Sequence, residues 1–140
     1  MLGNDISNKQ APILAFNIDS LVIEKKEVAR DIKFLPKMFR GEKTTYELDN
    51  VFINLINYVW SYYPYSIYFV TFHEEKMDFY YELLDAHKVN YTTLELNSKE
   101  TIRQSCTLHY TYYFDNDEEM LSYISMHNAT TCDSLLNVIK

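Results

Sequence analysis

The segment from Ile13 to Leu21 constrains the fold of this chain most strongly. It begins with four apolar residues directly after Pro12 and then reaches the polar side chains of Asn17 and Asp19. Such a short apolar run is typical of a strand that is buried on both faces of a sheet. Residues two apart on a strand point to the same side, so the sequence predicts that Asn17 and Asp19 project together from the carboxyl end of a central strand. Open α/β sheets bind ligands at that end.

The composition fits a single folded domain with an ordinary core. The chain has 140 residues, of which 47% are hydrophobic, and this proportion is typical of globular proteins. It contains only two glycines, so a glycine-rich P-loop and a dinucleotide-binding loop are both excluded. Cys106 and Cys132 are interpreted as reduced, buried thiols of a cytoplasmic protein. No apolar run is long enough to span a membrane, and the cysteines and histidines show no zinc-binding spacing.

Basic residues concentrate in one segment of an otherwise acidic chain. Residues 25–43 contain seven of the 13 basic residues and only three of the 20 acidic residues. This segment has a net charge of +4 within a total of −7, so the rest of the chain carries −11. The overall sign disfavours nucleic-acid binding. The exception is the basic segment, which would attract phosphate-bearing ligands if it overhung the carboxyl ends of the strands.

Patterns of strands and helices alternate along the chain. Strands are predicted over about 12–18, 66–71, 91–96, 111–114 and 129–132. Helices are predicted over about 48–63, 73–87, 97–105 and 117–127, with a helical turn or two at the end and a β-hairpin or irregular flap at 21–46. Strands that alternate with helices form parallel sheets through right-handed crossovers. We therefore expect an α/β fold, a three-layer sandwich with a mostly parallel, five-stranded, Rossmann-like sheet. A flexible tail at 1–10 would precede a single domain at 11–140 with little or no cap domain.

Residue spacing also predicts which side of each helix faces the core. In the first helix the apolar residues recur at i, i+3, i+4 and i+7; they are Leu48, Val51, Phe52, Leu55, Ile56, Val59 and Trp60. Pro64 would end this helix. In the second helix Met77, Tyr80, Tyr81 and Leu84 are expected to point inward. Asn97 and Glu100 fit a capping box at the start of the third helix.

Polar residues follow three of the buried strands. They are Asn17 and Asp19 after the first, Thr71 after the second, and Asp115 and Asp117 after the fourth. Lys99 and Arg103 lie on the helix before that fourth strand. Because the carboxyl ends of parallel strands share one edge, these groups can converge on a phosphate or a metal ion. Asp115 and Asp117 also fit a simpler interpretation, as turn and N-cap residues of the following helix.

This order of residues resembles the haloacid dehalogenase-like (HAD) superfamily of phosphohydrolases over about residues 12–132. The resemblance implies that Asn17 stands at the position of the nucleophilic aspartate, that Asp19 is the general acid and base, and that Thr71 binds phosphate through its hydroxyl. Lys99, or alternatively Arg103, would neutralise the phosphoryl group. The implied ligands of a Mg²⁺ ion are Asn17, Asp19, Asp115 and Asp117, and the segment 21–46 would be the flap.

The chain departs from the family pattern at the nucleophile. A carboxylate attacks phosphorus to form an aspartyl-phosphate, whereas the neutral amide of Asn17 is a poor nucleophile and a weakened magnesium ligand. Ser20 and Leu21 also stand where the family has Gly-Thr. The resemblance therefore implies a pseudo-phosphatase that binds a protein partner or a phosphorylated ligand, with weak or no hydrolysis.

Two alternatives remain open. The first is an active Mg²⁺-dependent phosphohydrolase, such as a nucleotidase, whose native residue 17 is aspartate. The second is a protein–protein interaction module on a HAD scaffold. Tyrosine-rich stretches would then form a partner surface or a homodimer interface, because tyrosine is enriched at such interfaces. The sequence alone leaves open whether the chain is an enzyme.

Overall fold

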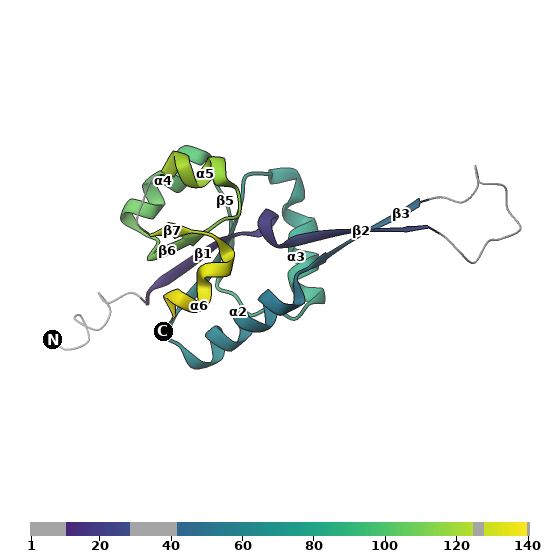
Figure 1. Cartoon of the computed structure of the whole chain (residues 1–140), viewed down its shortest axis with the longest axis horizontal. Helices are drawn as coiled ribbons and strands as arrows, with labels where there is room; N and C mark the ends of the chain where they lie inside the picture. Colours follow the sequence, from purple (N-terminus) through teal and green to yellow (C-terminus); the bar gives the residue numbers. More distant parts are fainter. Residues whose placement is uncertain (1–10, 29–41, 125–127, 140) are drawn as a thin grey trace, which may run out of the picture.

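The computed structural model of the chain describes residues 11–28, 42–124 and 128–139 (Figure 1). The strands in these ranges are β1 (Ile13–Asn17), β2 (Val22–Val28), β3 (Glu42–Leu48), β4 (Ser66–Thr71), β5 (Thr93–Leu96), β6 (Tyr112–Phe114) and β7 (Ala129–Thr130). The helices are α2 (Asn50–Tyr62), α3 (Met77–Ala86), α4 (Lys99–Leu108), α5 (Glu118–Ile124) and α6 (Leu135–Val138). Short 3₁₀ helices are η1 (Ile18–Leu21), η3 (Glu74–Lys76) and η4 (Cys132–Ser134).

The strand β1 lies at the centre of a five-stranded, all-parallel sheet with the order β5-β4-β1-β6-β7. On one side it pairs with β4, where Asn17 lies opposite Val70. On the other side it pairs with β6, where Phe16 lies opposite Phe114. The predicted parallel α/β sheet is confirmed. Because the chain moves to opposite sides of β1 in its later crossovers, the carboxyl end of β1 borders the crevice where such sheets bind ligands.

Helices cover both faces of this sheet, which confirms the predicted three-layer arrangement (Figure 1). Leu14 and Phe16 belong to the core under α2, α3 and α6, whereas Ile13 and Ala15 belong to the core under α4 and α5. This alternation is the period of two of a strand with both faces buried. Phe16 also stacks on Phe114 at a ring-centroid distance of 4.7 Å, which links the two central strands.

The strands β2 and β3 form an antiparallel hairpin that extends away from the sheet (Figure 1). Val22 pairs with Leu48 at its base and Val28 pairs with Glu42 at the far end of the described part. Leu48 is buried, so the base of the hairpin is anchored in the core. The predicted flap at 21–46 is thus a hairpin, and the described residues contain no large cap domain. Residues 29–41, which include most of the predicted basic segment, and the predicted tail at 1–10 lie outside the described residues.

The buried face of helix α2 was predicted only in part. Asp49 caps the helix, and its Oδ1 accepts hydrogen bonds from the N–H groups of Val51 at 3.0 Å and Phe52 at 3.4 Å. Phe52 is buried as predicted, but the prediction was wrong for Val51 and Trp60, which are 81% and 40% exposed. The helix is apolar on more than one side, so the spacing rule matched several overlapping stripes. The stripe that packs on the sheet includes Ile53 rather than Val51.

Two further details of the helices differ from the prediction. In α3 Tyr80 and Leu84 are buried as predicted, and Leu83 is buried as well. The prediction was wrong for Tyr81, which is exposed. The N-cap of α4 is Ser98, whose Oγ accepts a hydrogen bond from the N–H of Thr101 at 3.1 Å. The side-chain amide of Asn97 instead donates a hydrogen bond to the Tyr110 hydroxyl at 3.1 Å.

The remaining bounds agree with the prediction within a few residues. The third strand of the sheet is shorter than predicted and covers Thr93–Leu96. The last strand ends at Thr130, and the chain then enters η4. Of the predicted helix at 117–127, residues 125–127 lie outside the described ranges. None of the helices within the described ranges has the length and hydropathy needed to cross a membrane.

Candidate functional site

The chain turns at the carboxyl end of β1 directly into η1. Asn17 is both the last residue of β1 and the N-cap of η1, and its Oδ1 accepts a hydrogen bond from the backbone N–H of Asp19 at 2.9 Å. The two-residue spacing suggested that Asp19 continues the strand. Instead, a capped turn holds Asp19. Asn17 and Asp19 still line the same pocket, because the side chain of Asn17 fixes this turn.

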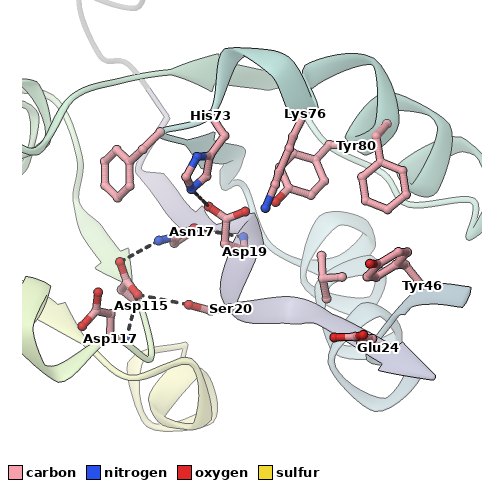
Figure 2. Close-up of a pocket in the computed structure, with 13 residues that line it drawn as sticks. Asn17, Asp19, Ser20, Glu24, Tyr46, His73, Lys76, Tyr80, Asp115 and Asp117 are labelled. Carbon is pink, nitrogen blue, oxygen red and sulfur yellow. Dashed lines mark hydrogen bonds and ion pairs between the residues drawn. The ribbon is translucent and has the colours of Figure 1, made fainter. Parts of the chain in front are cut away.

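Asp115, just after β6, is the centre of the hydrogen bonds at this edge of the sheet (Figure 2). Its fully buried carboxylate accepts two bonds at Oδ2, from Nδ2 of Asn17 at 2.9 Å and from the Tyr113 hydroxyl at 2.6 Å. At Oδ1 it accepts two more, from the Ser20 hydroxyl at 3.0 Å and from the N–H of Asp117 at 2.9 Å. A buried carboxylate is costly unless it is hydrogen-bonded. These four donors satisfy Asp115 and join the ends of β1 and β6.

Asp117 caps the helix α5. Its Oδ1 accepts hydrogen bonds from the N–H groups of Glu119 at 3.0 Å and Met120 at 3.4 Å. The simpler interpretation of this residue as an N-cap is therefore confirmed. Asp117 also lines the pocket, so its carboxylate faces the site while one of its oxygens holds the helix.

Thr71 lies at the end of β4, but its side chain does not reach the pocket. It is fully buried, and its Oγ1 accepts a hydrogen bond from the backbone N–H of His73 at 3.1 Å. The residues of this loop that line the pocket are Phe72 and His73. Thr71 therefore shapes the loop and does not present its hydroxyl to a ligand in this structure.

Neither of the two cations expected at the site, Lys99 and Arg103, lines the pocket. Lys99 is the first residue of α4, which follows the outer strand β5. Arg103 lies further along α4, with its guanidinium 5.8 Å from the centre of the Tyr123 ring. It lines a second, smaller hollow of about 330 Å³ on the outer side of α4.

The lysine that lines the pocket is Lys76, which the sequence-based prediction missed. It is the last residue of η3, directly before α3. Figure 2 shows its side chain on the same side of the pocket as His73, with its end near Asp19. The available signal was its position only five residues after Thr71, at the start of the helix that follows a central strand of the sheet.

His73 lies between two carboxylates beside Lys76. Its Nε2 is 3.8 Å from Oδ2 of Asp19, and its Nδ1 is 3.4 Å from Oε1 of Glu75. About half of the His73 side chain is covered, and it lines the pocket. The structure therefore places one histidine and one lysine beside Asp19.

Burial raises the pKa of Asp19 above its usual range, and the neighbouring charges of His73 and Lys76 only partly oppose this shift. Its Oδ1 is buried and has no hydrogen-bond partner among the described residues. A carboxyl group with a raised pKa keeps its proton up to a higher pH. This property is found in general acids and also in buried carboxyl groups that lack some of their hydrogen-bond partners.

The pocket itself is an open hollow of about 670 Å³, bordered by the strand ends, the hairpin and α3 (Figure 2). Its polar end is made by the residues after β1, β4 and β6 described above. Its other end is largely aromatic, with Tyr46 from β3 and Phe79 and Tyr80 from α3, and Glu24 of β2 stands beside it. Pockets of this size hold small-molecule ligands in many proteins.

The Mg²⁺ site implied by the sequence was tested against this geometry. Within the described part of the chain, no group of three or more His, Cys, Asp or Glu side chains is arranged to hold a metal ion. Asn17 directs its amide N–H toward Asp115, and both oxygens of Asp115 already accept hydrogen bonds. The side chains as they lie do not fit a magnesium site, and the expectation of Mg²⁺ stays a prediction.

Comparison with known proteins gave no significant match to any family model, any curated protein or any solved structure. The structure itself defines the class of protein: it has a Rossmann-like α/β fold with an all-parallel sheet and a projecting hairpin.

Proposed function

We propose that this chain is a HAD-like pseudo-phosphatase, which binds a ligand in the pocket at the end of β1 without hydrolysing a phosphate ester. The single observation that carries the proposal is the hydrogen bond from Nδ2 of Asn17 to Oδ2 of Asp115. It supports the proposal because the Asn17 amide donates a hydrogen bond that an ionised carboxylate, as at the nucleophile position of the proposed family, could not donate.

The kinship with the HAD superfamily is supported by where the polar residues meet. Asp19 follows β1, His73 follows β4, and Asp115 and Asp117 follow β6, and all four line one pocket. The central position of β1 between β4 and β6 brings these strand ends together. A fold alone does not define a function, so the proposal depends on the chemistry of this pocket.

The chemistry disfavours hydrolysis. An amide has no anionic oxygen to attack phosphorus, and loss of a covalent nucleophile lowers turnover by several orders of magnitude. Asn17 is 5% exposed, and its side chain is used at both ends, since Oδ1 accepts from Asp19 and Nδ2 donates to Asp115. Asn17 therefore acts here as a structural link between two strand ends.

A phosphatase assay of the purified full chain tests the proposal. The substrates are p-nitrophenyl phosphate and nucleoside 5′-monophosphates, each with and without Mg²⁺. We expect no turnover above the background of a mock purification. Mg²⁺-dependent turnover that is lost in Asp19→Asn would refute the proposal.

The first alternative, an active phosphohydrolase, is favoured by the setting of Asp19, which lines the pocket 3.8 Å from His73 and whose pKa is raised by burial. The variant Asn17→Asp separates the two functions. Strong Mg²⁺-dependent turnover in this variant would support an enzyme whose native residue 17 is aspartate. A folded variant without turnover supports the pseudo-phosphatase. Thermal unfolding of the variant serves as the folding control.

The second alternative, an interaction module, is favoured by the outer side of α2. Tyr58 and Tyr62 are exposed there with their rings 4.8 Å apart, and Trp60 is exposed on the same helix. Tyrosine and tryptophan are enriched at protein interfaces. Light scattering of the purified chain across a concentration series tests self-association, and a monomer at all concentrations would remove support for a homodimer.

A further inference from the structure

The pocket has a distinct chemical character in addition to its size. Tyr46 and Phe79 meet edge to face with ring centres 5.5 Å apart, and they connect the hairpin to α3. Tyr80 lies beside Phe79 with ring centres 5.6 Å apart. Together with Val22, these rings give one end of the pocket an apolar wall that can hold the body of a small ligand.

The charges around the pocket are unequal. Four carboxylates line it, those of Asp19, Glu24, Asp115 and Asp117, against one lysine, Lys76, and one histidine, His73. Burial raises the pKa of Asp19, and the nearby charges of His73 and Lys76 oppose this shift. These two residues therefore partly offset the charge of Asp19. The hydrogen bonds to Asp115 come from neutral donors, so none of them adds a positive charge to the site.

The carboxylates that a ligand could contact stand at two sides of the pocket. Asp117 makes both of its helix-capping hydrogen bonds through Oδ1. Glu24 is exposed on β2, with the Lys26 ammonium 3.9 Å away. Figure 2 shows Glu24 and Tyr46 together at the hairpin side and Asp117 at the strand-end side. A ligand between them would meet acceptors at both sides and aromatic rings along its length.

We infer that this pocket binds a small organic cation, with an ammonium head and an aromatic or aliphatic body. The inference deepens the proposed function, on which it rests, by naming the class of ligand. A cation gains attraction from the carboxylates and from the faces of the aromatic rings. An anion such as a free phosphate ester would enter a pocket of net negative charge, in which the backbone N–H of Asp19 is already bonded to Asn17.

Isothermal titration calorimetry with three probes of similar shape tests the charge of the ligand. They are 2-phenylethylammonium, the neutral 2-phenylethanol and the anionic 3-phenylpropionate. We expect saturable binding of the cation at one site and at least tenfold weaker binding of the neutral probe, since one charge contact of about 1.4 kcal/mol corresponds to that factor. The anion is expected not to bind. Equal binding of all three probes, or no binding of the cation up to about 10 mM, would overturn the inference.

Variants locate the binding site. Asp117→Asn keeps a side chain that can cap α5 while it removes one charge, and Glu24→Gln removes another with little change in shape. Each is expected to weaken binding of 2-phenylethylammonium by about threefold to tenfold, as for contacts of roughly 1 kcal/mol. Glu118→Gln removes a charge next to Asp117 but outside the pocket lining, and it should leave the affinity unchanged. Equal loss in all three variants would reduce the effect to net charge and refute the site.

The aromatic wall has its own test. Tyr46→Ala removes the ring that contacts Phe79 and should weaken binding of 2-phenylethylammonium at least tenfold. Tyr81→Ala removes an exposed ring of α3 that does not line the pocket, and it should leave this affinity unchanged.

A Mg²⁺ titration separates the organic cation from a metal ion, because competition by millimolar Mg²⁺ would assign the carboxylates to metal binding. Failure of these tests leaves the absence of phosphatase turnover unaffected, so the two proposals fail separately.

Discussion

The side-chain amide of Asn17 donates a hydrogen bond to Oδ2 of Asp115 across a distance of 2.9 Å, although the two residues are 98 positions apart. Asn17 ends β1, Asp115 directly follows the neighbouring parallel strand β6, and both residues are buried. An aspartate at position 17 would bring a second carboxylate against a buried one, where like charges disfavour ionisation strongly. The amide therefore provides the neutral donor that this strand junction requires.

The variant Asn17→Asp should lower the free energy of unfolding by about 3 kcal/mol, as expected when a buried charge loses its partner. Urea denaturation at neutral pH followed by circular dichroism measures the change. Asn54→Asp, on the exposed side of α2, is the matched control and should change stability by less than about 0.5 kcal/mol. An Asn17→Asp protein as stable as the parent chain would contradict this role of the amide.

The variant Asp19→Asn should stabilise the protein at neutral pH. Burial raises the folded-state pKa of Asp19 above the ordinary value of 3.8, so the folded state binds more protons than the unfolded state between these two values. Stability from this group is present below pH 3.8 and is lost as the pH rises through the folded-state pKa. The amide removes this loss, so its advantage should appear at pH 7 and vanish in acid.

Urea denaturation of the parent chain and of Asp19→Asn at several pH values measures the difference. Asp78→Asn, at an exposed position of α3, is the control and should show no such pH-dependent advantage. An advantage of Asp19→Asn that grows toward acid pH would show that the sign of the argument is wrong.

The variant Tyr113→Phe should destabilise the protein by about 2 kcal/mol, the usual cost of removing a hydrogen bond to a charged group. The lost bond is the one from the Tyr113 hydroxyl to Oδ2 of Asp115 at 2.6 Å. Burial, followed by the charge of Asp115, raises the pKa of Tyr113, so its hydroxyl remains a donor over the working range of pH. Tyr112→Phe on the same strand is the control, because Tyr112 has no part in this network. Equal effects of the two variants would count against it.

The thiols of Cys106 and Cys132 should be inert in the folded protein. Both are buried, and burial raises the pKa of each from 9.0 to about 12. Because the thiolate is the reactive form, Ellman's reagent at pH 8 should label neither thiol in the native chain and both in urea. Rapid labelling of the native protein would contradict this burial.

The same raised pKa values predict a loss of stability at alkaline pH. Between pH 9.0 and about 12 the folded state keeps protons on both thiols that the unfolded state releases, so the free energy of unfolding falls as the pH rises through this window. Cys132→Ala should reduce this dependence when thermal unfolding is followed from pH 8 to 11. An unchanged pH dependence in that variant would assign the loss to other groups.

The sequence predicted best those features that depend on the residue pattern within a single element. The apolar run of β1 and the alternation of strands and helices were enough to predict a parallel sheet with β1 buried on both faces. Helix faces were harder, because α2 is apolar on more than one side, and only packing on the sheet selects Ile53 over Val51. Hydrophobic spacing cannot rank two stripes of similar strength.

The site was harder still, because it is assembled from segments far apart in the chain. The spacing of Asn17 and Asp19 indicated a shared direction, but the capped turn that produces it is set by a hydrogen bond that no pattern shows. Lys99 and Lys76 both precede or begin helices near strand ends. Only the strand order shows that α4 follows the outer strand, while Lys76 follows β4 beside the centre.

The central position of β1 in the sheet has a consequence for folding during synthesis on the ribosome. Its five residues are synthesised before both of the strands that flank them, which are Ser66–Thr71 and Tyr112–Phe114. At a synthesis rate of about 5–20 residues per second, the gap to the second flank lasts roughly 5–20 s. Throughout that interval at least one edge of this apolar strand is unpaired, so chaperone capture or slowed translation should matter more for this protein than for one built from neighbouring hairpins.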